Sequence, residues 1–415
     1  MIAAIRHITV RQWVIWALAN LVLVAAMGVL MRLKILLPMP GINQKFLLHA
    51  HSHFAFSGWV SHALMTLIVA ALFSRKGHQT PPAKYQFVLF ANLLASYGML
   101  IGFFLQGYGA YSIAAAAATV IISYLFAIMC WRDMAKPTPH DNPAGHPWLR
   151  AALLFLAVSS IGTYCLAYLN ASGNTDPRLQ LASVYFFLHF QYNGWFFFAC
   201  MGLIYHLLGQ YHAPIKHTLA SYRLFVLACP VNFLLSVLWW DMPGWLYFVL
   251  VMAVMAQSGA WVIGLAQCLA NRRLMVHRLP PIAGRLFICV AVAATIKFTL
   301  QGLSVIPALS TLSYSFRPIV IGYLHLVLLG VISLFIMAYS YAAGLLSPNR
   351  IAIRSTIVFI AGVILNELLL MLQGIAGLAR TPVSHIPLLL AVAAGMLLAG
   401  IAGLLASQLR RFSTT

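Results

Sequence analysis

Long apolar runs recur along the whole chain, and each is long enough to cross a lipid bilayer as one helix. A crossing takes about 20 residues, and 62% of the 415 residues are hydrophobic while only 7% are charged. Because backbone polar groups in lipid must be satisfied within a segment, such runs predict helices. We therefore expect an all-α polytopic membrane protein with about twelve transmembrane helices, at 12–36, 46–73, 85–105, 109–131, 150–169, 181–208, 220–240, 245–269, 284–306, 317–344, 353–375 and 386–408.

The predicted helices group into three sets of four, which we expect to be pseudo-equivalent units of a single transmembrane domain, 1–415. The sets cover about 12–131, 150–269 and 284–408. A repeat of residues supports this grouping, since His53, His189 and His325 are spaced 136 residues apart. They open the similar segments HFAFSGW, HFQYNGW and HLVLLG. Self-similarity at a long fixed period indicates a repeated architecture.

The net charge of +20 does not indicate a nucleic-acid partner, because the basic residues are divided unequally between the two sides of the predicted membrane. Of the 25 Lys and Arg residues, Lys297 lies inside a predicted span and six lie in one set of loops, namely Arg32, Lys34, Lys45, Arg178, Arg317 and Arg380. The others lie on the opposite side. By the positive-inside rule we expect both termini in the cytoplasm, the chain in the inner membrane of a bacterium, and the lipid bilayer as its partner.

The repeated histidines are candidate metal ligands. His53 lies eight residues after Lys45, His189 eight after Leu181 and His325 eight after Arg317, so we expect the three imidazoles at similar depth in the outer half of the membrane. A histidine there is costly unless it is hydrogen-bonded or bound to a metal. His49 shares the helix face of His53 at i, i+4, whereas His51 faces the other way. We include both in the candidate metal-binding set, with structural hydrogen bonding as the alternative for any single histidine.

Twelve helices in three sets, with histidines near the outer ends of the second, sixth and tenth, resemble the catalytic subunit of the haem–copper oxidase superfamily, which includes cytochrome oxidases and nitric oxide reductases. The resemblance implies that His53 and His325 are the axial ligands of a low-spin haem b. It implies that His189 binds copper or non-haem iron. It also makes Arg380, or alternatively Arg317, the partner of the haem propionates, and implies electron transport with an electron donor or respiratory subunit.

The chain also departs from the pattern of this family. Where helix 10 of the family carries the first histidine of His-x-His, this sequence has Tyr323. Helix 7 of the family supplies two adjacent histidines to copper, and the corresponding span, 221–240, contains none. We therefore expect the binuclear centre to be lost, and whether the protein is an active oxidoreductase stays open. Tyrosine can ligate haem iron, so a second haem at Tyr323 and copper at His189 are the alternative cofactors.

Two other functions fit the sequence. One is a copper- or haem-handling membrane protein, similar to the twelve-helix family that accompanies nitric oxide reductases, with the histidines of the second and sixth spans as ligands. The other is a secondary transporter, although transporter repeats usually come as two halves of six. Lys297 and Glu367 fall at similar depth in the ninth and eleventh predicted spans. We predict that they form a buried ion pair, with a proton relay as the alternative.

Overall fold

The structure, a computed structural model, describes residues 7–73, 80–136, 143–214, 218–309, 317–381 and 383–410. These residues form helices and no β-strand. Eleven of the helical stretches in the described ranges are long and apolar enough to cross a membrane. The chain is therefore an all-α polytopic membrane protein whose surroundings are a lipid bilayer, as the apolar runs predict.

The count of apolar spans is eleven rather than the expected twelve, and the difference lies in the span predicted at 181–208. That region is helical throughout, as α8 (Pro177–His189), η3 (Phe190–Phe196) and α9 (Phe197–Gln210), but it is not among the apolar spans. The polar side chains of the HFQYNGW segment lie in its middle and lower its hydropathy. A helix can be buried inside a protein without being apolar along its whole length.

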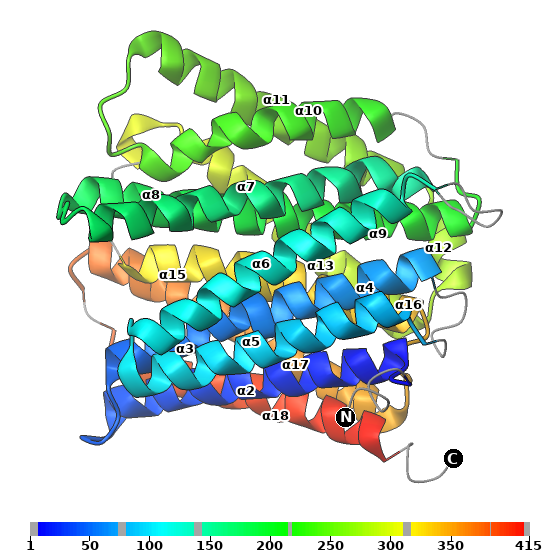
Figure 1. Ribbon diagram of the computed structural model, residues 1–415, viewed down its shortest axis with the longest axis horizontal. Coiled ribbons are helices and arrows are strands. Elements are labelled where there is room, and N and C mark those ends of the chain that lie inside the picture. The colour runs from blue at the N-terminus through cyan, green and yellow to red at the C-terminus, as the bar shows by residue number, and fades with distance from the viewer. Residues whose placement is uncertain are drawn as a thin grey trace. The chain divides into compact units, whose positions relative to one another are not determined.

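The chain divides into two compact units, and unit 1 consists of Met1–Ile128 with Ser333–Thr415. Within unit 1, α18 packs against both α17 and α2, and α3 packs against α5 (Figure 1). Segments from the two ends of the chain thus share one core. The helices of unit 1 are α2 (Val10–Leu36), α3 (Gln44–Phe54), η1 (Ala55–Ser61), α4 (His62–Phe73), α5 (Ala83–Gln106), α6 (Ala110–Asp133, as far as Ile128), α16 (Leu334–Ala342), α17 (Arg350–Leu378) and α18 (Ile386–Leu409).

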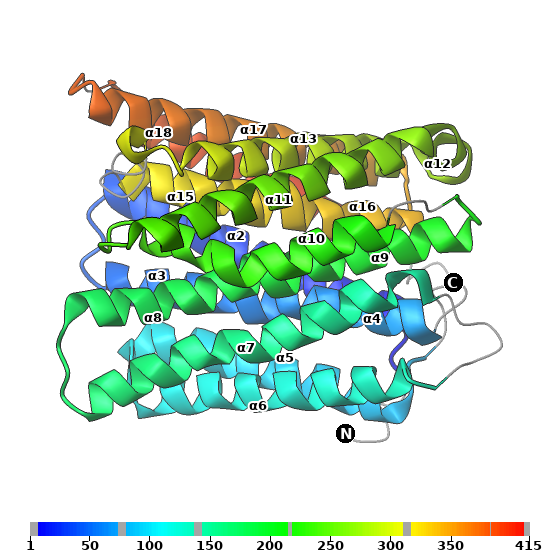
Figure 2. The same ribbon diagram turned by 90° about the horizontal axis from the view of Figure 1, so that it is seen from above.

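Unit 2 is Met129–Ile332. In it α7 packs against α8 and α9, and α10 packs against α11 (Figure 2). The unit boundaries fall within α6 and η5, so they do not coincide with the three predicted sets of four, and the threefold grouping stays a prediction. Besides α8, η3 and α9, the helices of unit 2 are η2 (Pro143–Gly145), α7 (His146–Ala171), α10 (Thr218–Val231), η4 (Asn232–Val237), α11 (Gly244–Ala270), α12 (Arg272–Arg278), α13 (Pro281–Leu303), α15 (Arg317–His325) and η5 (Leu326–Ser333).

Several helices begin at residues whose side chains satisfy the first free backbone N–H groups. Thr9 and Gln12 form a capping box at the start of α2. The side chain of Asp176 accepts from the N–H of Arg178, and a proline occupies the first position of α8. Asn349 accepts from the N–H of Ala352 at the start of α17. These caps and the apolar runs explain why the observed bounds lie within a few residues of the predicted ones for most spans.

Candidate functional site

A π-helical segment follows each of the three repeated histidines. η1 begins two residues after His53, η3 begins directly after His189, and η5 begins directly after His325. π-Helical turns are rare in proteins and occur frequently at functional sites. The repeat is therefore present in the backbone as well as in the sequence, although the sequence pattern alone did not predict these segments.

Buried amides hold the π-helical turn of η1 in unit 1. Nδ2 of Asn20 donates to the Gly58 carbonyl at 2.6 Å, and Nδ2 of Asn92 donates to the Ser57 carbonyl at 3.3 Å. The Tyr97 hydroxyl donates to Oδ1 of Asn20 at 2.7 Å. A turn that departs from the i→i−4 pattern leaves its carbonyls in need of other donors. The two asparagines supply them and fix the backbone that directly follows His53.

His53 projects from α3 toward the loop between α5 and α6. Its ring stacks on Phe103, with the ring centroids 4.1 Å apart and the planes at 7°, and its Nε2 lies 3.1 Å from the Tyr108 hydroxyl. The ring of His49 lies 4.7 Å from the ring of Tyr108. His49 and His53 therefore share one face of α3, as the i, i+4 spacing predicts. The structure finds no hydrogen-bond partner for the buried Nε2 of His49 among the described residues.

His51 faces a different neighbour. Its Nδ1 lies 3.1 Å from the carbonyl of Val24 on α2. Because a carbonyl can only accept, Nδ1 carries the hydrogen and donates it. The prediction that His51 points away from His53 is confirmed, and the contact ties α3 to α2.

The loop that carries Tyr108 depends on the glycine before it. Gly107 has φ +63°, and a Cβ there would lie 2.4 Å from the ring of Phe46. The Ser112 hydroxyl donates to the Gly107 carbonyl at 2.6 Å. A larger residue at 107 would meet both backbone strain and a clash. The turn places the Tyr108 hydroxyl at His53.

His189 is buried, with 1% of its surface exposed, and both of its ring nitrogens are engaged. Nε2 lies 2.8 Å from the Cys229 carbonyl, so it must donate, while Nδ1 accepts from the Asn193 amide at 3.2 Å. A metal ion could bind His189 only by displacing one of these partners. The geometry fits a neutral, structural histidine better than a ligand of copper or non-haem iron.

The element that supplies the Cys229 carbonyl is irregular. α10 contains Pro230 and gives way to the 3₁₀ turn η4, so the span predicted at 220–240 is a broken helix. Proline lacks an N–H group and disturbs the helical bonds around it. No group of three or more His, Cys, Asp or Glu side chains that could hold a metal occurs within the described ranges.

His325 ends α15, and its Nδ1 lies 2.8 Å from the carbonyl of Ile321, one turn earlier. Nδ1 therefore donates, and in the neutral ring Nε2 carries the lone pair. Histidines that bind metals commonly donate their other nitrogen to a backbone carbonyl in this way. His325 thus has the tautomer that an axial ligand of haem needs. His53 belongs to unit 1 and His325 to unit 2, and their binding of a common iron atom stays a prediction.

Of the remaining candidate residues, Arg317 and Arg380 lie at helix ends, and Tyr323 contacts another aromatic ring. Arg317 is the first residue of α15, but its side chain lies outside the described residues. Arg380 is exposed and follows α17 with φ +53°, the left-handed conformation common after a helix. Tyr323 makes an edge contact with Tyr192, the ring centroids being 6.2 Å apart. The roles of these residues toward haem stay predictions.

Lys297 is buried in α13, with 1% of its surface exposed. Its Nζ donates to Oε1 of Gln301 at 3.2 Å and lies 4.0 Å from the centroid of the Phe298 ring. Gln257 donates to the same Gln301 oxygen at 3.0 Å. Glu367, in unit 1, accepts from the Asn366 amide at 3.1 Å. An amide oxygen and an aromatic face stabilise the ammonium within unit 2, and its pairing with Glu367 stays a prediction.

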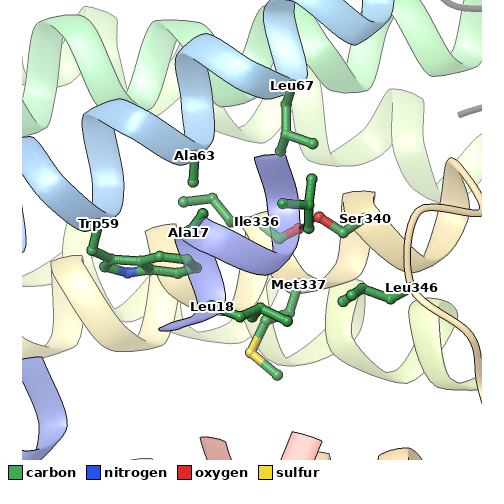
Figure 3. Close-up of a pocket in the computed structure, with 10 residues that line it drawn as sticks. Ala17, Leu18, Trp59, Ala63, Leu67, Ile336, Met337, Ser340 and Leu346 are labelled. Atoms are coloured by element: carbon green, nitrogen blue, oxygen red, sulfur yellow. Dashed lines mark hydrogen bonds between the residues drawn. The ribbon is translucent and has the colours of Figure 1, made fainter. Parts of the chain in front are cut away.

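Unit 1 contains a small apolar cavity beside η1 and α4. Its volume is about 10 Å³, and the indole of Trp59 and the side chains of Leu67 and Met337 lie around it (Figure 3). The Trp59 indole N–H donates to the Ser333 hydroxyl at 2.9 Å. A space of this size holds about one water molecule at most, so this cavity is not a cofactor site.

The glycine of the second repeat makes a close contact in unit 2. A Cβ on Gly194 would lie 2.6 Å from Cβ of Phe155 on α7, and such glycines allow helices to approach closely. We expect Gly194→Ala to lower the free energy of unfolding by about 1–3 kcal/mol, because Phe155 or the backbone must move. Thermal unfolding in detergent would measure this. Gly259→Ala is the control, since nothing lies within 4 Å of a Cβ there; an equal loss in both variants would contradict the contact.

The structure thus brings His49, His53 and Tyr108 together in unit 1, and His189 and Asn193 together in unit 2. Tyr108 and the buried asparagines were not predicted as site residues. The sequence Gly107-Tyr108-Gly109 indicates a tight turn, and a turn of this kind can orient the side chain at its centre. This pattern could have identified Tyr108. No protein-family model matches the chain, and no curated protein matches it either.

Proposed function

We propose that this integral membrane protein binds a low-spin haem b through His53 and His325, on a scaffold similar to that of the haem–copper oxidases, and transfers electrons. The observation that most supports this is the joint recurrence, at an interval of 136 residues, of a histidine and a π-helical segment. Bis-histidine haem supplies one-electron transfer, and with both axial positions filled it does not bind a gas.

The two histidines would contribute in different ways. His325 is held in the required tautomer by its bond to the Ile321 carbonyl, which also orients the ring. His53 is held by the Phe103 ring, while the Tyr108 hydroxyl lies at the nitrogen that would bind iron. Because Tyr108 is 55% exposed, its side chain can move aside without disturbing the core. Each histidine taken by itself thus suits a haem ligand, His53 once Tyr108 has turned away.

The remaining assignments complete the proposal. Arg380, or alternatively Arg317, would neutralise the propionates at the outer surface, and the bias of basic residues supports cytoplasmic termini in a bacterial inner membrane. An electron donor or respiratory subunit would be the protein partner. Since the copper ligands of the family are lacking at helix 7 and His189 is engaged by Cys229 and Asn193, we propose no oxygen-reducing centre.

An optical spectrum of the purified protein tests this function. We expect a haem spectrum with a narrow, split α-band on reduction, as six-coordinate b haem gives. The same band should be obtained when the protein is expressed with added haem precursor and purified without added haem. A preparation that is folded and monodisperse, but has no Soret band under either condition, would exclude the proposed function.

Tyr108→Phe is expected to raise the affinity of the haem-free protein for haem. The variant removes a hydrogen bond to Nε2 of His53 that competes with iron, and such a bond contributes about 1 kcal/mol, or roughly fivefold in affinity. Titration of haem into the haem-free protein, followed at the Soret band, would measure it. Tyr111→Phe, at the start of α6, is the control, because its hydroxyl makes no hydrogen bond with any described residue. Equal haem affinities of Tyr108→Phe and Tyr111→Phe would show that the Tyr108 hydroxyl does not compete with iron for Nε2 of His53.

Copper handling is the second candidate, and one observation favours it. His49 and His53 share a face, and Nε2 of His49 is buried without a hydrogen-bond partner in the described residues. Two imidazoles one turn apart can bind a copper ion together. Metal analysis distinguishes the two functions: copper with little haem, lost in His49→Ala, would select copper handling over electron transfer.

A further inference from the structure

α12 forms a basic surface at one end of unit 2, between the membrane-crossing helices α11 and α13. Arg272, Arg273, His277 and Arg278 are all exposed. Val276 is exposed as well, at 74% of its surface, and it lies one turn after Arg272 and Arg273, on the same face of the helix. Val276, Arg272 and Arg273 are therefore presented together at the boundary of the membrane, and Arg278 ends the same short helix.

Among the described residues of unit 2, no counter-ion is bonded to the cations of α12. No hydrogen bond or ion pair joins the three guanidinium groups to Asp133, Asp176 or Asp241, the carboxylates of unit 2 that the structure describes. Arg150, by contrast, donates to the Met134 carbonyl. Asp241 precedes α11, whose 27 residues separate it from α12 by about 40 Å. Asp176 precedes α8, which lies at the other end of the unit in both views (Figures 1 and 2). As far as the described residues go, the charge of α12 is thus left for a ligand from outside the chain.

The position of α12 decides which kind of anion fits. Guanidinium groups bind phosphate in a bidentate manner, and the exposed Val276 is stabilised by an apolar neighbour. A nucleic acid or an acidic protein would leave that valine in a polar setting. Only a phospholipid presents a phosphate and an acyl chain side by side at this boundary. We propose that α12 is a binding site for the headgroup of an anionic phospholipid, with Arg272, Arg273 and Arg278 as the phosphate-binding residues.

The experiment compares lipid retention by the full-length protein. Protein in nanodiscs of phosphatidylcholine, with or without phosphatidylglycerol, is released and its bound lipids are counted by native mass spectrometry. We expect the wild type to retain phosphatidylglycerol preferentially. Each guanidinium removed should lower that retention roughly fivefold, since a basic residue near an anionic surface contributes about 1 kcal/mol. The variant Arg272→Gln/Arg273→Gln/Arg278→Gln should therefore lose the preference.

A matched pair of single variants controls for net charge. Arg273→Gln and Arg178→Gln each remove one exposed arginine of unit 2, and only the first should weaken retention. If the triple glutamine variant does not fold, the triple lysine variant, which keeps the charge but lacks the bidentate geometry, should show a partial loss. Equal retention of the two lipids by the wild type, or equal effects of Arg273→Gln and Arg178→Gln, would overturn the proposal.

Discussion

Replacing His325 with alanine is expected to abolish the split α-band of the reduced protein. Removal of one axial imidazole leaves iron five-coordinate at best, and the narrow band depends on two strong axial ligands. His53→Ala should have the same effect, because it removes the other axial imidazole. Both substitutions lie at positions of intermediate burial, so the fold should persist, which far-ultraviolet circular dichroism and size-exclusion chromatography would check.

His51→Ala is the matched control for this prediction. It removes an imidazole from α3 two residues from His53, but that ring donates to the Val24 carbonyl and is not expected to face the iron. We expect its spectrum to match the wild type. If His53→Ala and His325→Ala both keep the split band while His51→Ala loses it, the pair of axial ligands has been assigned wrongly. If all three keep it, the ligands lie elsewhere in the chain.

The spans and the faces of α3 could be predicted from the sequence because they follow from local periodicity. The apolar run predicted at 46–73 corresponds to the observed span Gln44–Phe73. Because the bilayer sets the minimum length of a crossing helix, a run of apolar residues of that length is enough to predict it. The opposite directions of His51 and His53 follow from about 100° of rotation per residue. Neither inference needs a contact from a distant part of the chain, and both are confirmed.

The π-helical segments and the cover over His53 could not be predicted in the same way. η1 is held by Asn20 and Asn92, which come from two other helices, so its geometry depends on tertiary contacts. The Tyr108 hydroxyl reaches His53 across 55 residues of chain. The irregular end of α10 was open to prediction, because Pro230 stands inside the apolar run, and treating 220–240 as one regular helix overlooked it.

His189→Ala is expected to have the largest effect on stability. The variant leaves the Cys229 carbonyl and the Asn193 amide without their partners and opens a cavity at a site that is 1% exposed. Loss of a buried hydrogen-bonded group together with its volume costs about 3–5 kcal/mol. We expect a correspondingly lower midpoint of thermal unfolding in detergent. His277→Ala, on the exposed face of α12, should change the free energy of unfolding by no more than about 0.5 kcal/mol.

A second substitution separates the structural role of His189 from the metal-binding role that its place in the repeat implies. Glutamine can still donate to the Cys229 carbonyl, so His189→Gln should recover part of the stability lost in His189→Ala. Metal content should be the same in the wild type and in His189→Gln, because the two hydrogen bonds leave no nitrogen for an ion. A glutamine variant that is as stable as the wild type but has lost a bound copper or iron would establish His189 as a ligand, and the hydrogen bonds to Cys229 and Asn193 would then describe only the metal-free protein.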